Sequence, residues 1–139
     1  MAMTSAQQQV NKLLQHFGKR VGADLSLQDG VCALYDNAGE QAAVVEAHGE
    51  TDTVIIHCRM ADFNTVDNLL LHRQMLMLNF EISAMRGTWL ALDDDGHLRL
   101  CAAYFIEILT DNSFSDMLEG FINHAVEVKS FIAERLQDS

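Results

Sequence analysis

The sequence predicts an α+β domain. Three segments carry apolar residues at helical spacing, and short strand-like runs bounded by turn signals lie between them, without the strand–helix–strand alternation of a parallel sheet. The expected order is a helix, three or four strands in an antiparallel meander, a central helix, a strand hairpin and a C-terminal helix. A chain of 139 residues can bury one sizeable core, so we expect a single domain over 1–139.

The first helix is expected between Thr4 and Gly22. Thr4 and Gln7 have the T-x-x-Q spacing of a capping box, and Gly22 suits the end of a helix. A strand near 25–27 and a turn at 29–30 should follow. Further strands are predicted at 31–35, 42–46 and 53–59, because short apolar runs alternate there with polar turns.

The central segment, 64–87, is predicted to form one continuous helix that begins at Asn64 or Thr65 and ends at Gly87. Apolar residues occupy nearly all of its sides, which is typical of a helix that is buried on two sides. We expect one side to pack on the sheet and the other on a second copy of the chain. Which stripe faces the second copy is left open. The predicted dimer interface consists of Leu70, Leu71, Met75, Leu78, Ile82, Met85 and Trp89.

The last part of the chain should contain a hairpin and a long helix. Strands are expected at 88–92 and 98–105, on either side of an acidic turn. Ser113 and Asp116 have the spacing of a capping box, which places the helix start at Ser113. One apolar stripe then runs along this helix, with Phe114, Met117, Leu118, Phe121, Ala125, Val128, Ile132 and Leu136.

Composition excludes several classes of partner. The net charge of −11 argues against nucleic acid, because phosphate binding needs a basic surface. Apolar stretches are too short for a membrane helix, and the N-terminal sequence MAMTSAQQQVNKLL lacks the apolar core of a signal peptide. We therefore expect a cytosolic protein that binds neither nucleic acid nor a membrane.

Metal and cofactor motifs are not found in the sequence. The acidic turn 93–96 does not have the spacing of a calcium loop, because the first ligand position would be Ala91. The six histidines show neither HxH nor HExxH spacing, and no phosphate-binding glycine loop occurs. We expect no cofactor and no metal.

The three cysteines, Cys32, Cys58 and Cys101, lie in apolar strand-like runs and are expected to be buried structural residues. Sequence patterns of a nucleophile elbow are absent as well. The alternative hypothesis is a small α+β enzyme that uses His57 or Cys101.

The apolar faces of the first strands are the remaining feature to explain. A half-buried antiparallel sheet should have a polar face toward solvent, yet the outer faces of the first strands carry Cys32, Leu34, Ala43 and Val45. These positions need a cover, which is either a long partner segment or the protein's own helices.

Several segments resemble the class I effector chaperones of bacterial type III secretion, the CesT-like family, and among them the DspF/AvrF type that serves AvrE-family effectors. The resembling segments are VNKLLQHF at 10–17, QDGVCALY at 28–35, IHCR at 56–59, LNFE at 78–81, AMRGTWLALD at 84–93, and the stretches 98–101 and 114–124. The resemblance implies a small acidic cytoplasmic α+β homodimer without enzymatic activity.

The resemblance also implies a function. Such chaperones bind an N-terminal effector segment, which wraps around the dimer, and keep it soluble and competent for secretion. By position, the effector-binding residues would be Leu13, Leu14, Phe17, Cys32, Leu34 and Val45. The secretion ATPase is left open as a further partner, and a regulatory binding protein of the secretion system is left open as an alternative role.

Overall fold

The computed structural model describes residues 2–65 and 69–137. In chain order its elements are α1 (Ser5–Val21), β1 (Val31–Tyr35), β2 (Gln41–Glu46), β3 (Thr53–Asp62), α2 (Leu69–Leu78), α3 (Ile82–Met85), β4 (Trp89–Leu92), β5 (His97–Phe105), the 3-10 turn η1 (Ile106–Ile108) and α4 (Asp111–Gln137). This order confirms the predicted α+β class.

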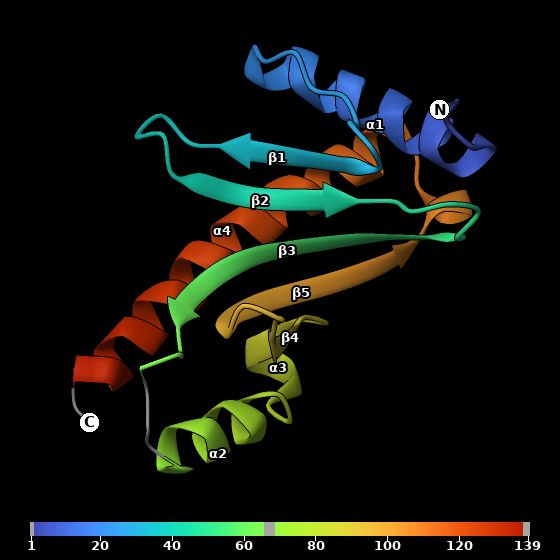
Figure 1. Ribbon diagram of the computed structural model, residues 1–139. Coiled ribbons are helices and arrows are strands. Elements are labelled where there is room, and N and C mark those ends of the chain that lie inside the picture. Colours follow the sequence, from blue (N-terminus) through green and yellow to red (C-terminus); the bar gives the residue numbers. More distant parts are fainter. Residues whose placement is uncertain (1, 66–68, 138–139) are drawn as a thin grey trace.

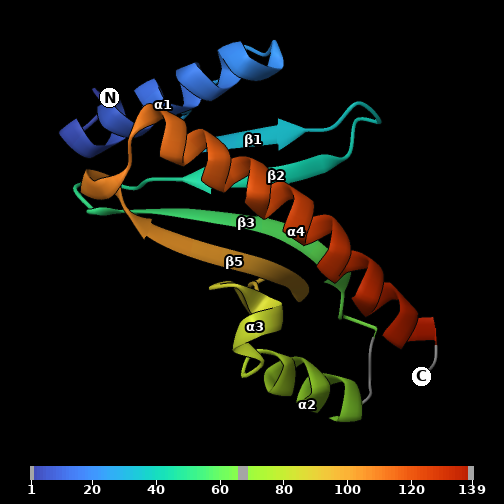
Figure 2. The same cartoon turned by 180° about the vertical axis from the view of Figure 1, so that it is seen from behind.

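The five strands form one antiparallel sheet in the order β1-β2-β3-β5-β4. The long helix α4 crosses one face of this sheet, and α1 lies beside β1 and packs against α4 (Figures 1 and 2). Within the described residues no helix crosses the opposite face, and α2 and α3 extend from the β4 side of the sheet (Figure 1). The molecule therefore has one helix-covered sheet face and one open sheet face.

The core lies between the sheet and the two long helices. From α4, Phe114, Leu118 and Ile132 are fully buried against strand residues such as Ile56 and Leu100. The predicted apolar stripe of the C-terminal helix is thereby confirmed. No helix in the described part of the chain is both long enough and apolar enough to cross a membrane.

Both long helices begin at capping boxes. The Thr4 hydroxyl accepts from the Gln7 N–H at 3.2 Å, and the Gln7 side chain accepts from the Thr4 N–H at 3.0 Å, as predicted. The start predicted for the last helix is wrong by two residues. Thr110, not Ser113, is the capping residue, because its hydroxyl accepts from the Ser113 N–H at 3.1 Å and Ser113 Oγ accepts from the Thr110 N–H at 2.8 Å. Ser113 is therefore the third helical residue of this box.

The meander is largely as predicted, except before β1. The expected strand at 25–27 is wrong, because only an isolated bridge joins Gln28 to Val31 there. The turn between them is present, with Asp29 and Gly30 both in the left-handed region at φ 52° and 80°, as a tight primed hairpin turn requires.

The central segment is two helices rather than one. Helix α2 ends at Leu78 and α3 begins at Ile82. The sequence predicts that this helical segment begins at Asn64 or Thr65. That prediction involves residues 66–68, which lie outside the described residues. The predicted end is close to the structure, because α3 closes with Arg86 and Gly87 both left-handed.

Candidate association and partner-binding surfaces

The six residues predicted to bind an effector lie in the hydrophobic core. None of them exposes more than 6% of its surface: Leu13, Leu14, Phe17, Cys32, Leu34 and Val45. The prediction of an exposed patch at these positions is therefore wrong. The sequence left two alternatives for the cover of these strands, a partner segment or the protein's own helices. The structure has the helices, because the side chains of α1 and α4 pack on this face of the sheet.

The predicted dimer residues divide into two groups. Leu71, Met75 and Met85 are buried within their own chain, and Leu78 packs partly buried against the core. Leu70, Ile82 and Trp89 are exposed at their surface, and Ile82 is 78% accessible. The first group therefore packs within its own chain, and the second group faces solvent.

Exposed apolar side chains are concentrated on α2, α3 and the connection between them. Phe80 is 84% exposed, and it belongs to a group that we call the α2–α3 apolar patch: Leu69, Leu70, Leu76, Met77, Phe80 and Ile82. Isolated exposed apolar residues are ordinary, whereas a contiguous group on one projecting segment indicates an association surface.

The open sheet face is a second apolar surface. Cross-strand register places Val44, His57, Cys101 and Trp89 in one row across four strands, with Ile55 in the adjacent row. Ile55 and Trp89 are each 40% exposed, and Phe105 at the end of β5 is 56% exposed. Sequence reasoning assigned only Trp89 of these residues to an association surface, and it named His57 and Cys101 only for the alternative hypothesis of an enzyme. The missed signal was the run Val54-Ile55-Ile56, which is apolar on both faces of its strand.

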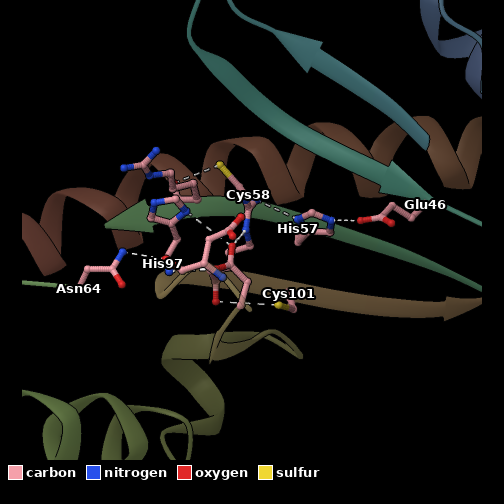
Figure 3. Close-up of polar contacts among 10 residues, drawn as sticks. Glu46, His57, Cys58, Asn64, His97 and Cys101 are labelled. Carbon is pink, nitrogen blue, oxygen red and sulfur yellow. Dashed lines mark hydrogen bonds and ion pairs between the residues drawn. The ribbon is translucent and has the colours of Figure 1, made fainter. Parts of the chain in front are cut away.

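A chain of polar contacts crosses the open sheet face (Figure 3). The Glu46 carboxylate contacts His57 Nε2, and the Arg99 guanidinium donates to His57 Nδ1 at 3.1 Å. Arg99 Nε also donates to Asp93 Oδ2 at 2.6 Å. Since arginine has only donors, Nδ1 must accept, and the ring proton of His57 lies on Nε2 and is donated to Glu46.

This arrangement bears on the alternative hypothesis of an enzyme. Cys101 lies directly opposite His57 in the adjacent strand and on the same face, which resembles a nucleophile and its base. However, both ring nitrogens of His57 are used by Glu46 and Arg99. Burial raises the pKa of the Cys101 thiol above its ordinary value, whereas an activated nucleophile needs a lowered one. The pair is not arranged for nucleophilic catalysis.

The acidic turn after β4 is held by its own hydrogen bonds. Asp93 Oδ1 accepts from the N–H groups of Asp95 and His97, both at 2.9 Å. The side-chain atoms of Asp93, Asp95 and His97 that could bind a metal ion lie within 4.8 Å of one another. However, the Asp93 carboxylate already accepts hydrogen bonds from these amides and from Arg99. The turn geometry therefore accounts for the Asp93 carboxylate without a metal ion.

Asp93 should make the free energy of unfolding depend on pH in the acidic range. The hydrogen bond from Arg99 is the main cause that lowers the pKa of Asp93 from 3.8 to about 2. A carboxyl group with a depressed folded-state pKa stabilises the fold above its unfolded pKa, and the contribution is lost as pH falls through the folded value. We expect Asp93→Asn to be less stable than the parent at neutral pH, and the difference to shrink between about pH 4 and pH 2. Urea unfolding across this range measures it, and a difference that stays constant would contradict the assignment.

Asn79 explains both the break between α2 and α3 and the state of the sheet edge. Its amide oxygen accepts from the Leu90 N–H at 2.7 Å, and its amide nitrogen donates to the Leu90 carbonyl at 3.1 Å. Asn79 thus pairs with the outer edge of β4 as a neighbouring strand would. A closed edge is one way in which proteins prevent unwanted strand pairing.

Replacing Asn79 by alanine should loosen this edge. We expect a loss of about 1 kcal/mol in unfolding free energy, since two hydrogen bonds are removed while the freed Leu90 groups gain water. Hydrogen exchange of the Leu90 amide should become faster. Asn79→Asp is the matched control, because it keeps an acceptor for the Leu90 N–H. Unchanged exchange in Asn79→Ala would show that Asn79 does not protect the edge.

The fold is a helix-backed antiparallel sheet with an exposed apolar group on the projecting helix pair α2–α3. The chain belongs to the Tir chaperone protein (CesT) family, whose model matches residues 12–129. The family that the sequence resembles is thereby confirmed. A search among curated proteins found no match.

Solved structures share the fold at low sequence identity. A chain of the ExsC–ExsE complex is 20% identical with a TM-score of 0.75, over 91% of this chain and 95% of that chain. A chain of the HopA1–SchA chaperone–effector complex is 12% identical with a TM-score of 0.73, over 96% and 99%. A chain of the ExoU–SpcU complex from the type III secretion system of Pseudomonas aeruginosa is 19% identical with a TM-score of 0.64, over 88% and 93%.

Proposed function

We propose that this protein is a type III secretion chaperone that binds a segment of a secreted effector and keeps it soluble and competent for export. The observation that carries the proposal is the match of the CesT family model to residues 12–129. Two solved relatives are named as a chaperone–effector complex and as a complex from a type III secretion system. The two separate apolar surfaces fit this role, since one can bind a partner while the other joins two copies.

The finer assignment follows the sequence resemblance. The bound segment is the N-terminal region of the effector, the site of action is the bacterial cytoplasm, and the chaperone is of the DspF/AvrF type, which serves AvrE-family effectors. The secretion ATPase is a further partner that would receive the loaded chaperone. The catalytic alternative is disfavoured, because His57 has no free ring nitrogen to activate the Cys101 thiol.

The functional unit is a homodimer formed through the α2–α3 apolar patch. Exposure of large apolar side chains such as Phe80 in a single chain would be a liability for aggregation, and a two-fold interface would cover them. Leu70 and Ile82 from the predicted interface belong to this patch. Leu71, Met75 and Met85 support it from within their own chain.

A deletion strain tests the chaperone function. Proteins secreted under type III inducing conditions are compared between the parent, the deletion strain and a complemented strain by mass spectrometry. We expect one effector, or a small set, to be lost from the medium and restored by complementation, while other effectors are secreted normally. An unchanged set of secreted proteins would contradict the proposed function.

A further inference from the structure

The open sheet face ends in a pocket that differs in charge from the rest of the face. The pocket has a volume of about 430 Å³, and its lining includes Glu46, His57, the acidic turn 93–95, Arg99 and Cys101. Cys101 connects it to the apolar row, because Cys101 lies opposite Trp89 in the β4–β5 register. The apolar surface and the pocket are therefore one continuous site.

The charges in this pocket are not balanced. Four carboxylates line it, and Arg99 is the one lysine or arginine in its lining. Arg99 is already paired with Asp93 at 2.6 Å. The side chains of Asp94 and Asp95 have no hydrogen-bond or ion-pair partner among the described residues. Arg59 also lies on this face, opposite Arg99 in the β3–β5 register, but it does not line the pocket.

We propose that the open sheet face, with the pocket at its Asp93–Asp95 end, binds a partner segment that carries an apolar side chain next to a lysine or arginine. The apolar side chain packs on Trp89 and Ile55, and the cationic group enters the pocket and pairs with Asp94 or Asp95. Charge complementarity selects this occupant, because a cation gains unpaired carboxylates there, whereas an acidic segment would meet like charge. The inference rests on the proposed chaperone function and names the kind of effector segment that this face takes.

The single tryptophan of the chain reports on this face. Trp89 is its only tryptophan and is partly exposed beside the pocket. The probe is a short soluble serine-rich peptide with leucine–lysine pairs and no aromatic residue. Matched peptides replace every lysine by glutamate or every leucine by serine. Binding is followed by the anisotropy of labelled peptides, and its location by the emission of Trp89 with unlabelled ones.

We expect the leucine–lysine peptide to bind and to shift Trp89 emission to shorter wavelength. Each matched peptide should bind about tenfold more weakly, and the lysine-dependent part should decrease with salt. Asp94→Lys combined with Asp95→Lys should cause a similar loss. The control is Glu127→Lys combined with Glu134→Lys, which makes the same charge change on exposed positions of α4. Circular dichroism establishes that each variant is folded, and Ile55→Ser serves as a second test if the lysine variant is not.

Several results would overturn the inference. These are failure of the leucine–lysine peptide to bind, equal binding of the lysine and glutamate peptides, binding without a change in Trp89 emission, or equal losses in the Asp94/Asp95 variant and its α4 control. A changed sedimentation coefficient of the peptide-free Asp94/Asp95 variant would instead assign the face to a second copy of the chain. If effector secretion still depends on the gene in those cases, the inference fails and the chaperone function stands. An unchanged set of secreted proteins would contradict both the inference and the chaperone function.

Discussion

Replacing Phe17 and Leu34 together by glutamate is expected to unfold the protein, not to remove an exposed binding patch. Both side chains lie in the core between the sheet and the long helices, at 3% and 6% exposure. Loss of the packing of Phe17 alone should cost about 3–5 kcal/mol, and an unpaired buried carboxylate adds to that cost. The sum is comparable with the whole stability of a typical domain, which is about 5–15 kcal/mol. Urea unfolding followed by circular dichroism measures the effect.

Neighbouring exposed positions give the control for this experiment. Val21 at the end of α1 and Tyr35 next to Leu34 are both more than half exposed. The double change Val21→Glu and Tyr35→Glu adds the same charge to the same two elements, and we expect it to leave stability nearly unchanged. A Phe17/Leu34 variant that remains as stable as this control would show that the two residues are not part of the core. Loss of effector binding in the Phe17/Leu34 variant would therefore not identify a contact surface.

The sequence predicts elements well where their signals are local. The first helix has its capping box and its terminal glycine at its own two ends, and the structure confirms both. The turn at Asp29 and Gly30 is also local, since it depends on two residues that accept a left-handed backbone. The length and apolar stripe of α4 follow from a repeat that continues over many turns.

The central segment illustrates what local signals cannot predict. Its apolar pattern continues through 79–81, and nothing nearby in sequence indicates a break. The break is explained by Asn79, whose amide pairs with Leu90 eleven residues further along. This contact joins residues from different elements of the folded chain, so a tertiary hydrogen bond overrides the helical pattern.

The candidate sites could likewise be predicted only in part from the sequence. Apolar residues on both faces of the first strands predict that both faces need a cover. The structure confirms a cover on one face, but alternation alone does not say which face the helices take. The structure places Cys32, Leu34 and Val45 beneath the helices, so the surface left for a partner is the other face. Family resemblance likewise identified the family without identifying the contact residues, because those positions depend on how each chain packs.

The charge pattern of the open sheet face could also not be predicted from the sequence alone. Glu46, His57, Arg99 and Asp93 come from four separate places in the sequence and meet through the sheet register and the hairpin turn. Burial opposes ionisation of Glu46, but hydrogen bonds from His48 and His57 outweigh it and hold the pKa of Glu46 below its ordinary value. The carboxylate therefore stays charged, which leaves the pocket acidic near neutral pH.

The second large effect is expected at the proposed dimer interface. Phe80→Asp combined with Ile82→Asp should convert the protein from dimer to monomer without unfolding it. Both side chains are more than three-quarters exposed in the single chain, so the changes remove little packing within it. In a two-fold interface each substituted residue appears twice, so the introduced charges also repel their symmetry mates. Loss of a central interface residue costs about 2 kcal/mol or more, which is about thirtyfold in Kd for each position.

Sedimentation velocity over a range of concentrations measures this change, and thermal unfolding checks that the variant is folded. Val126→Asp is the control, because Val126 is an exposed apolar residue on α4, away from the α2–α3 apolar patch. We expect the control to sediment like the parent dimer. A parent that is monomeric at all concentrations, or a Phe80/Ile82 variant that stays dimeric, would contradict association through this patch. Because the substituted residues lie outside the pocket at the Asp93–Asp95 end of the sheet, a folded monomeric variant would also show whether one copy can bind the leucine–lysine peptide by itself.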